Sequence, residues 1–193
     1  MIKAVIFDCF GVLTVDTWVE FCGTLPEGEV ADTARRLNHQ YDSGKISLKE
    51  FLDEVSRVTG RVRSDIVAIF THPAATKNAR LFEYIQELSS KYKIGLLSNV
   101  GTNWVREDFL NTEEQKLFSA MVFSYEIGTT KPDPKAYEAI ANKLGAKPSE
   151  AVFIDDQLAY CEGAEDFGMK AIVYINFPQI KTELEQTLSA ANN

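Results

Sequence analysis

The chain has 193 residues, of which 45% are hydrophobic and 25% are charged, and this composition is typical of a folded domain with one sizeable core. Its formal net charge is −8, whereas proteins that bind the phosphate backbone of nucleic acids are normally basic, so we expect no nucleic-acid partner. We expect no membrane partner either, because no apolar run approaches the roughly 18 residues of a spanning helix.

The three cysteines, Cys9, Cys22 and Cys161, are odd in number, far apart and at no spacing typical of a zinc site. Met1 leads directly into a predicted strand, without the charged and apolar regions of a secretory leader. Both features favour a reducing compartment, and we expect the protein to be cytoplasmic. No feature of the sequence indicates an oligomeric state.

The first predicted strand is the apolar run 4–7, which is followed at once by Asp8. A run this short with no polar alternation is typical of a strand buried on both faces of a parallel sheet. Asp8 then lies where the chain leaves the sheet, and ligands bind at that edge of open parallel sheets. An aspartate that only caps a turn is the alternative for this stretch taken alone.

Residues 15–75 show helical patterns and no strand pattern. One amphipathic helix has its apolar residues at Val30, Ala34, Leu37 and Tyr41. A second helix opens with a capping box, in which Ser47 precedes Glu50 by three residues, and it ends at Gly60. A third, at 66–70, is stopped by His72–Pro73. We therefore expect a small all-helical insertion over 15–75, between the first strand and the rest.

From residue 76 onward, strands and helices alternate. The predicted strands are 93–97, 120–123, 151–154 and 171–174, and helices are expected between them, including one over 102–110, one opened by a capping box of Thr112 with Gln115, and one over 134–144. This alternation predicts crossover connections and a doubly wound parallel sheet with helices on both faces, formed by 1–14 and 76–193.

Polar residues stand at four places in the chain where strands or loops end: Asp8, Ser98 with Asn99, Lys131, and Asp155 with Asp156. If the sheet is parallel, the strand ends meet at one edge and form a polar pocket. A carboxylate there can act as a nucleophile, and several carboxylates suit Mg²⁺. A lysine and a hydroxyl can hold an anionic group, so the set favours phosphoryl transfer.

Each member also has a purely structural interpretation. Ser98 and Asn99 are ordinary turn residues, Lys131 is a common solvated side chain, and Asp156 is a candidate N-cap for the helix that follows. The conjunction of these residues in one chain is much more specific than any one of them.

The four stretches resemble the four motifs of the haloacid dehalogenase-like (HAD) hydrolases: Phe7–Asp8–Cys9–Phe10–Gly11–Val12–Leu13, Leu97–Ser98–Asn99, Lys131–Pro132–Asp133–Pro134 and Phe153–Ile154–Asp155–Asp156. The segment 44–47 leading into Phe51 is similar to the cap of a subgroup of sugar-phosphate phosphatases. The resemblance covers nearly the whole chain. It implies a Rossmann-like α/β/α core with a helical cap, Mg²⁺ as cofactor, and an aspartyl-phosphate intermediate formed on a small phosphorylated metabolite.

The resemblance also implies a role for each motif residue. Asp8 is the nucleophile and a metal ligand, and the backbone carbonyl of Phe10 is a second ligand. Asp156 is the third ligand, with Asp155 beside it acting directly or through water. Ser98 and Lys131 grip the phosphate, with Asn99 adjacent to them, and Lys131 takes part in catalysis.

One departure from the family pattern concerns the chemistry. The family's phosphatases usually have a second aspartate two residues after the nucleophile, which protonates the leaving group and later activates water, and here that residue is Phe10. Acid–base catalysis of this kind contributes roughly a hundred- to ten-thousand-fold. We therefore expect a phosphatase whose substrate needs little protonation, such as a sugar 1-phosphate or an acyl phosphate.

Two alternatives follow from the same departure. The family's 2-haloacid dehalogenases carry an aromatic residue at this position, because a halide leaves without a proton, but they usually have serine and asparagine where Asp155 and Asp156 stand. The other alternative is a non-catalytic member of the family that binds a phosphorylated ligand or a partner protein.

Overall fold

Five parallel strands form the centre of the computed structural model, which describes residues 1–70 and 76–191. Their order across the sheet is β3-β2-β1-β4-β5. The strands are β1 (Ala4–Phe7), β2 (Lys93–Ser98), β3 (Ala120–Phe123), β4 (Ala151–Asp155) and β5 (Lys170–Val173). β1 and β4 are buried along their whole length, as apolar strands of a sheet covered on both faces must be. The predicted α/β fold is therefore confirmed.

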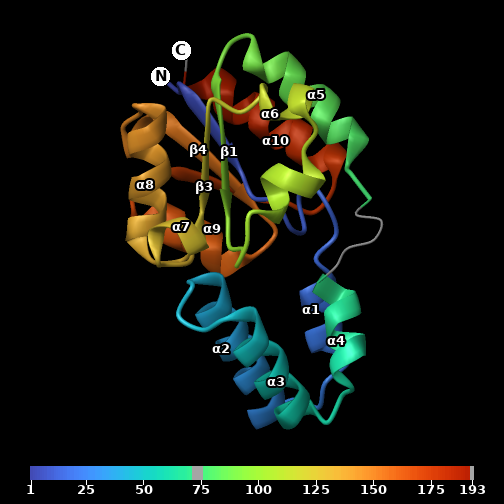
Figure 1. Ribbon diagram of the computed structural model, residues 1–193. Helices are drawn as coiled ribbons and strands as arrows, with labels where there is room; N and C mark the ends of the chain where they lie inside the picture. Colours follow the sequence, from blue (N-terminus) through green and yellow to red (C-terminus); the bar gives the residue numbers. More distant parts are fainter. Residues whose placement is uncertain (71–75, 192–193) are drawn as a thin grey trace.

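Helices cover both faces of this sheet (Figure 1). Because side chains alternate along a strand, Val5 and Phe7 of β1 belong to one core cluster, while Ala4 and Ile6 belong to another. The first cluster is completed by two helices and the second by two others: α5 (Ala79–Ser89) and α10 (Phe177–Ala190) on one face, α8 (Pro134–Leu144) and α9 (Leu158–Asp166) on the opposite face.

The segment between β2 and β3 differs from its prediction. In place of an α-helix over 102–110, the chain forms one short π-helix, η1 (Val105–Phe109). The next helix, α6 (Thr112–Gln115), does have a capping box, but the pair is Asn111 with Glu114. Gln115, expected to belong to that box, instead donates its amide to the carbonyls of Arg106 and Leu110 at 2.8 and 3.0 Å. That contact satisfies carbonyls at the end of the π turn.

Four strand boundaries also differ by one residue. β2 continues through Ser98, and β4 continues through Asp155, which pairs with Val173 of β5. β5 is Lys170–Val173 and not 171–174. The predicted strand over 151–154 stopped where the apolar run stopped. Asp155 therefore belongs to the sheet, and Asp156 is the first residue beyond it.

Residues 17–70 form a separate group of helices at one end of the sheet (Figure 1). These are α1 (Thr17–Gly23), α2 (Glu29–Asp42), α3 (Leu48–Thr59) and α4 (Arg63–Phe70). They enclose a core of their own, built by Leu37, Tyr41, Phe51, Leu52, Val55 and Ile66. The capping box of Ser47 with Glu50 and the end of α3 at Gly60 are as predicted. The expected stop at His72–Pro73 lies outside the described residues.

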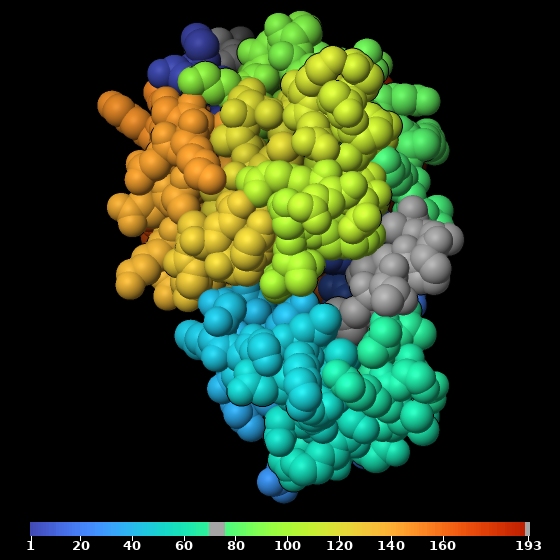
Figure 2. All heavy atoms as spheres, in the orientation of Figure 1, coloured from blue at the N-terminus to red at the C-terminus, as the bar shows by residue number. Residues whose placement is uncertain are grey.

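The C-terminal end of α2 is fixed to the sheet domain. The hydroxyl of Ser124, at the start of α7 (Ser124–Ile127), donates to the carbonyl of Asp42 at 2.6 Å and accepts from the amide of Val100 at 2.8 Å. His39 Nδ1 lies 3.3 Å from Thr130 Oγ1. Figure 2 shows this end of the helical group seated against the segment that follows β3. The contact depends on Gly101, because a Cβ there would lie 2.5 Å from the ring of Tyr41.

We expect Gly101→Ala to destabilise the protein by about 1–3 kcal/mol, which is the usual effect of overpacking a close contact. The Tyr41 ring also stacks on Phe51, with the ring centroids 4.9 Å apart, and this packing limits its freedom to move away. Urea denaturation measures the difference in the free energy of unfolding. The matched control is Gly23→Ala, where a Cβ meets nothing within 4 Å. Equal stability of the two variants would contradict this account of the contact.

Candidate active site

The candidate site lies at the carboxyl ends of β1, β2 and β4. Asp8 follows β1, Ser98 is the last residue of β2, and Asp155 is the last residue of β4. β1 is the central strand. β2 and β3, which follow it in the chain, lie on one side of it, and β4 and β5 lie on the other side. The gap between the connections of β1 and β4 is therefore a topological switch point, where open α/β sheets bind their ligands.

Lys131 joins two of these strand ends. Its Nζ lies 2.8 Å from Asp8 Oδ1 and 2.6 Å from Asp155 Oδ2, and the Lys131 and Asp155 side chains are completely buried. Burial by itself lowers the pKa of the ammonium, but the charges of Asp155 and Asp8 outweigh it and raise that pKa. Lys131 is therefore a permanent cation at the centre of the site and not a solvated surface lysine.

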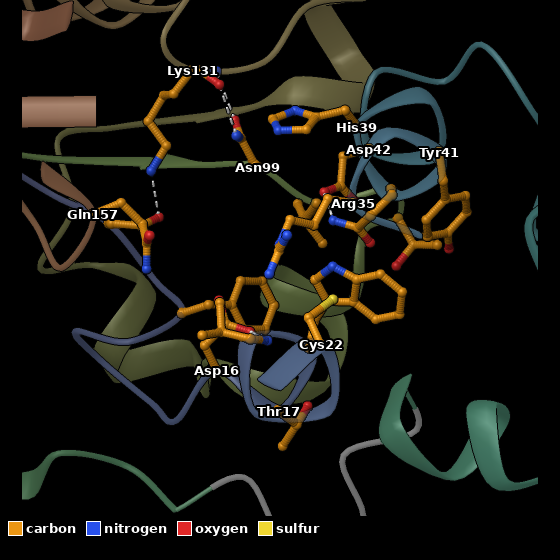
Figure 3. Close-up of a pocket in the computed structure, with 18 of the residues that line it drawn as sticks. Asp16, Thr17, Cys22, Arg35, His39, Tyr41, Asp42, Asn99, Lys131 and Gln157 are labelled. Carbon is orange, nitrogen blue, oxygen red and sulfur yellow. Dashed lines mark hydrogen bonds and ion pairs between the residues drawn. The ribbon is translucent and has the colours of Figure 1, made fainter. Parts of the chain in front are cut away.

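Asn99 fixes the backbone of Lys131 from the end of β2. Its amide nitrogen donates to the carbonyl of Lys131 at 3.2 Å, and its amide oxygen accepts from the backbone N–H of Lys131 at 2.9 Å (Figure 3). The amide thus pairs with both polar groups of one peptide residue. Asn99 is close to the site as expected, and its structural work is to hold the lysine loop in place.

Three carboxylates gather beside the lysine. Asp8, Asp155 and Asp156 each offer an oxygen, and these oxygens lie within 4.8 Å of one another. Burial is the main cause that raises the pKa of Asp8 well above its usual range, and the charges of Asp155 and Asp156 add to it against the opposing charge of Lys131. Burial and the charge of Asp155 raise the pKa of Asp156 to about 6. The cluster carries more negative charge than the single lysine compensates.

Apart from Asp8 Oδ1, which lies 2.8 Å from Lys131 Nζ in an ion pair, two buried polar atoms in this region lack a hydrogen-bond partner among the described residues: Asp156 Oδ1 and Ser98 Oγ. The Asp156 carboxyl packs directly on the loop after β1, where a Cβ on Gly11 would come within 2.3 Å of its Cγ. Buried polar atoms are normally paired, and an unpaired one at a functional site calls for an explanation. A buried carboxylate oxygen in an acidic cluster fits a hard divalent cation, and a buried hydroxyl fits an anionic oxygen.

The structural alternative for Asp156 is wrong. The N-cap position of α9 is Gln157, and no side chain there makes a capping hydrogen bond. Instead, Asp156 Oδ2 accepts from the side-chain amide of Gln157 at 2.8 Å, which orients the carboxyl while its other oxygen stays unpaired.

Phe10 belongs to a stack of aromatic rings. The centroids of the Phe10 and Trp104 rings are 5.8 Å apart, and the angle between the ring planes is 20°. Trp104 in turn stacks on Phe109, with a centroid distance of 5.3 Å and an interplanar angle of 24°. Trp104 immediately precedes η1, so the π turn places it against Phe10. At the position of the usual second aspartate, the protein therefore has an apolar wall.

A pocket of about 600 Å³ lies between the strand ends and the helical group. Five of the residues singled out from the sequence line it from the sheet domain: Asp8, Phe10, Asn99, Lys131 and Asp156. The other two, Ser98 and Asp155, are completely buried and are not among its lining residues. Its opposite wall comes from residues that the motif analysis missed, and Figure 3 shows several of them around the cavity: Asp16, Trp18, Arg35, Asn38, His39 and Asp42.

A weak signal for the α2 residues was present in the sequence. Asn38 and Asp42 are four residues apart and flank the apolar positions Leu37 and Tyr41. Polar residues at this spacing share one side of a helix, so they line the edge of its buried face. The spacing does not predict which part of the protein this edge contacts, because its partners, Ser124 and Gly101, are far from α2 in the sequence.

The sequence model of the haloacid dehalogenase-like hydrolases matches residues 2–168. The chain belongs to this family. As a HAD hydrolase, it has the four motifs within the matched residues. The recognition of the family from the motifs is thereby confirmed.

Characterised relatives include phosphatases. A phosphatase of Mycobacterium tuberculosis is 27% identical over 208 residues, covering 98% of this chain and 94% of that protein. The D-ribitol-5-phosphate phosphatase of Bacteroides thetaiotaomicron is 25% identical over 211 residues, covering 98% of this chain and 100% of that protein. The chain also matches the mouse acyl-CoA dehydrogenase family member 10, at 28% identity over 191 residues, but spans only 18% of that longer protein.

Solved structures share the fold. A HAD-like hydrolase of Porphyromonas gingivalis superposes with a TM-score of 0.72 at 26% identity, covering 97% of this chain and 98% of that chain. A HAD family enzyme of Bacteroides thetaiotaomicron, crystallised with magnesium and inorganic phosphate, superposes with a TM-score of 0.64 at 22% identity, covering 91% and 95%.

Two further features bear on the expectations about membranes and about the cysteines. Among residues 1–70 and 76–191, no helix combines the length and the apolar character that crossing a membrane requires. Cys9, Cys22 and Cys161 are buried free thiols.

We expect Lys131→Met to lower the free energy of unfolding by about 3–5 kcal/mol, because removing one partner leaves buried carboxylates uncompensated. The pKa of Asp8 is already above its unfolded value, so ionised Asp8 disfavours folding, and loss of the cation strengthens that effect. The deficit relative to the wild type is therefore expected to be larger at pH 8 than at pH 5, because a rising pH favours the ionised form of Asp8, whose raised pKa makes that form costly in the folded state.

Urea denaturation at both pH values, in EDTA, measures this deficit. The control is Lys116→Met, whose ion pair with Glu113 is exposed and contributes about 0–1 kcal/mol. A deficit that matches the control, or one that grows as the pH falls, would count against the role assigned to Lys131.

Proposed function

We propose that the protein is a Mg²⁺-dependent phosphatase of small phosphorylated metabolites. The observation that carries the proposal is the buried ion pair of Lys131 with Asp8 and Asp155, beside the unpaired oxygens of Asp156 and Ser98. This arrangement suits a dianionic phosphoryl group held next to a carboxylate nucleophile. The names of two relatives that match almost the whole chain, the phosphatase of Mycobacterium tuberculosis and the D-ribitol-5-phosphate phosphatase of Bacteroides thetaiotaomicron, support the same conclusion.

Asp8 is the proposed nucleophile. One of its carboxylate oxygens forms a bond to phosphorus while the bond from phosphorus to the leaving oxygen breaks. The products are an aspartyl-phosphate and the leaving alkoxide or carboxylate, and an alkoxide takes its proton from solvent water. A second water then attacks the phosphorus, the bond from phosphorus to the Asp8 oxygen breaks, and the carboxylate, phosphate and one proton are released. Lys131 keeps the nucleophile in place and neutralises phosphate charge, and the hydroxyl of Ser98 donates to a phosphate oxygen.

The donor set fits Mg²⁺. Asp8 and Asp156 would supply carboxylate oxygens, and the backbone carbonyl of Phe10 would be the further ligand that the family resemblance implies. Asp155 belongs to the same cluster, while its charge is paired with Lys131. Mg²⁺ prefers oxygen ligands and retains several waters. When bound, the ion screens the negative charges of nucleophile and phosphate, so that they approach one another.

Phe10 restricts the substrates that this site handles well. A phenylalanine ring, here stacked on Trp104, neither donates a proton to the leaving oxygen nor activates water. Substrates whose leaving group is stable without full protonation keep most of their reactivity, and sugar 1-phosphates and acyl phosphates belong to this class. The favoured substrates are therefore these two classes.

Residues 15–75 are proposed as a cap, with 1–14 and 76–193 as the catalytic core. The cap has its own hydrophobic core and meets the strand ends across the pocket. A cap in this place excludes water from the reacting phosphate and selects the leaving group.

We expect Mg²⁺-dependent phosphate release that is fastest with sugar 1-phosphates and acetyl phosphate and at least tenfold slower with sugar 6-phosphates. The assay measures phosphate from each substrate, with Mg²⁺ and with EDTA, and Asp8→Asn is the blank. Halide release from 2-chloropropionate without metal would instead establish the dehalogenase alternative. A folded protein that releases phosphate from nothing would overturn the proposal and favour a binding role.

Mg²⁺ is expected to stabilise the protein, by about 2.7 kcal/mol at a hundredfold excess over its dissociation constant, which corresponds to roughly 5–10 °C in Tm. Asp156→Asn removes a proposed ligand charge, and most of this shift should vanish. Thermal unfolding with and without Mg²⁺ measures it. The control is Asp53→Asn, an exposed carboxylate on α3. Equal shifts in both variants would place the metal elsewhere.

A further inference from the structure

Asp42 is a buried carboxyl in the pocket for which the proposed mechanism has no use. It is the last residue of α2, its side chain is almost completely buried, and it lines the same cavity as Asp8 and Lys131. Figure 3 shows it across the cavity from Lys131. Buried carboxyls are rare unless they have a partner or a function.

Asp42 is fixed in position and is not on a mobile loop. Its carbonyl accepts from Ser124 at 2.6 Å, which ties the helix end to the sheet domain. Its Oδ2 accepts from the amide nitrogen of Asn38, one turn earlier, at 2.8 Å. The carboxyl and the amide therefore form a joined polar pair on the wall of the pocket, at a set place relative to the strand ends.

The charged groups around Asp42 favour its neutral form. Burial and the facing charge of Asp16 raise its pKa to about 8, while Asn38 and the more distant Lys131 lower it by less. Arg35, His39 and Tyr41 are the other ionisable groups on its own helix near the pocket. A neutral carboxyl both donates and accepts a hydrogen bond, as an alcohol does.

We propose that Asp42, held by Asn38, binds a hydroxyl group of the leaving group and so selects polyhydroxylated phosphates such as sugar 1-phosphates. This inference rests on the proposed phosphatase function and deepens it. The joined acid and amide offer a donor and an acceptor to one hydroxyl, and the rings of Trp18, Trp104 and Phe10 give the pocket apolar walls for the carbon face of a sugar. A pocket built around a hydroxyl rejects analogues without it, because its polar groups are then left unpaired.

A pairwise comparison of variants and substrates tests this role. The substrates are glucose 1-phosphate, its monodeoxy analogues and acetyl phosphate, and the variants are Asp42→Ala, Asp42→Asn and the exposed control Asp53→Asn. In the wild type, we expect one monodeoxy analogue to lose about 10–100-fold in kcat/KM relative to glucose 1-phosphate, the range of a hydrogen bond to a buried polar group. In Asp42→Ala, removal of that same hydroxyl should have almost no further effect.

The two Asp42 variants separate recognition from other roles. Asparagine keeps a donor and an acceptor without a charge, so Asp42→Asn should retain most of the preference for glucose 1-phosphate over acetyl phosphate, while Asp42→Ala loses it mainly through KM. If Asp42→Asn instead loses kcat only on esters with poor leaving groups, Asp42 is a proton donor and the hydroxyl role is wrong. If Asp42→Ala loses equally on all substrates, Asp42 is merely structural.

Binding without turnover distinguishes failure of this inference from failure of the proposed function. Trp18 and Trp104 line the pocket, so their fluorescence reports ligands in the Asp8→Asn protein. We expect glucose 1-phosphate to bind about 10–100-fold more weakly when Asp42→Ala is added to Asp8→Asn. Equal affinities would overturn the role of Asp42 whether or not the wild type hydrolyses phosphate. A wild type without turnover whose ligand affinity still depends on Asp42 would overturn the phosphatase alone.

Discussion

The ion pair of Lys131 with Asp8 and Asp155 is the constraint on which the site depends. A fully buried ammonium is expensive to desolvate, and it is tolerated here because two carboxylates from neighbouring strands receive it. Its loop is in turn held by Asn99 from a third strand. One side chain thus fixes the relative positions of three strand ends. A hydrophobic residue would pack there at lower cost, so the retained charges point to chemistry and not to stability.

The negative charge left over explains why the cluster is prepared for a cation. Lys131 compensates one charge of the three carboxylates, and burial raises the pKa of Asp8 and Asp156 because their ionised forms lack solvation. Asp155 forms an ion pair with Lys131, while one oxygen of Asp156 has no hydrogen-bond partner among the described residues. Two adjacent aspartates therefore have different surroundings. The difference arises from the strand boundary, since Asp155 lies inside β4 and Asp156 just beyond it.

The fold and the core half of the site were predictable because both follow from local pattern. Short apolar runs gave the strands, and the polar residues after them converge once the strands are parallel, as Asp8, Ser98 and Asp155 do. The other half of the pocket was not predictable. Asp42 reaches the site through a hydroxyl contact with Ser124, 82 residues later in the chain. The π turn that brings Trp104 to Phe10 also escaped prediction, because its helical spacing resembles that of an ordinary α-helix.

The stack of Phe10 on Trp104 changes how the work is divided between the two halves of the pocket. An acid at this position would sit on the catalytic loop and act on any leaving group that reached it. With an aromatic ring there, the loop after β1 has only Asp8 and a backbone carbonyl for the proposed chemistry, and the pocket wall at Phe10 is apolar. Under the proposed mechanism, the acid and amide groups that meet the leaving group are those of Asp42 and Asn38 on α2. Selection of the leaving group thereby depends on how the helical segment docks, and the tight contact of Tyr41 with Gly101 is what sets that docking.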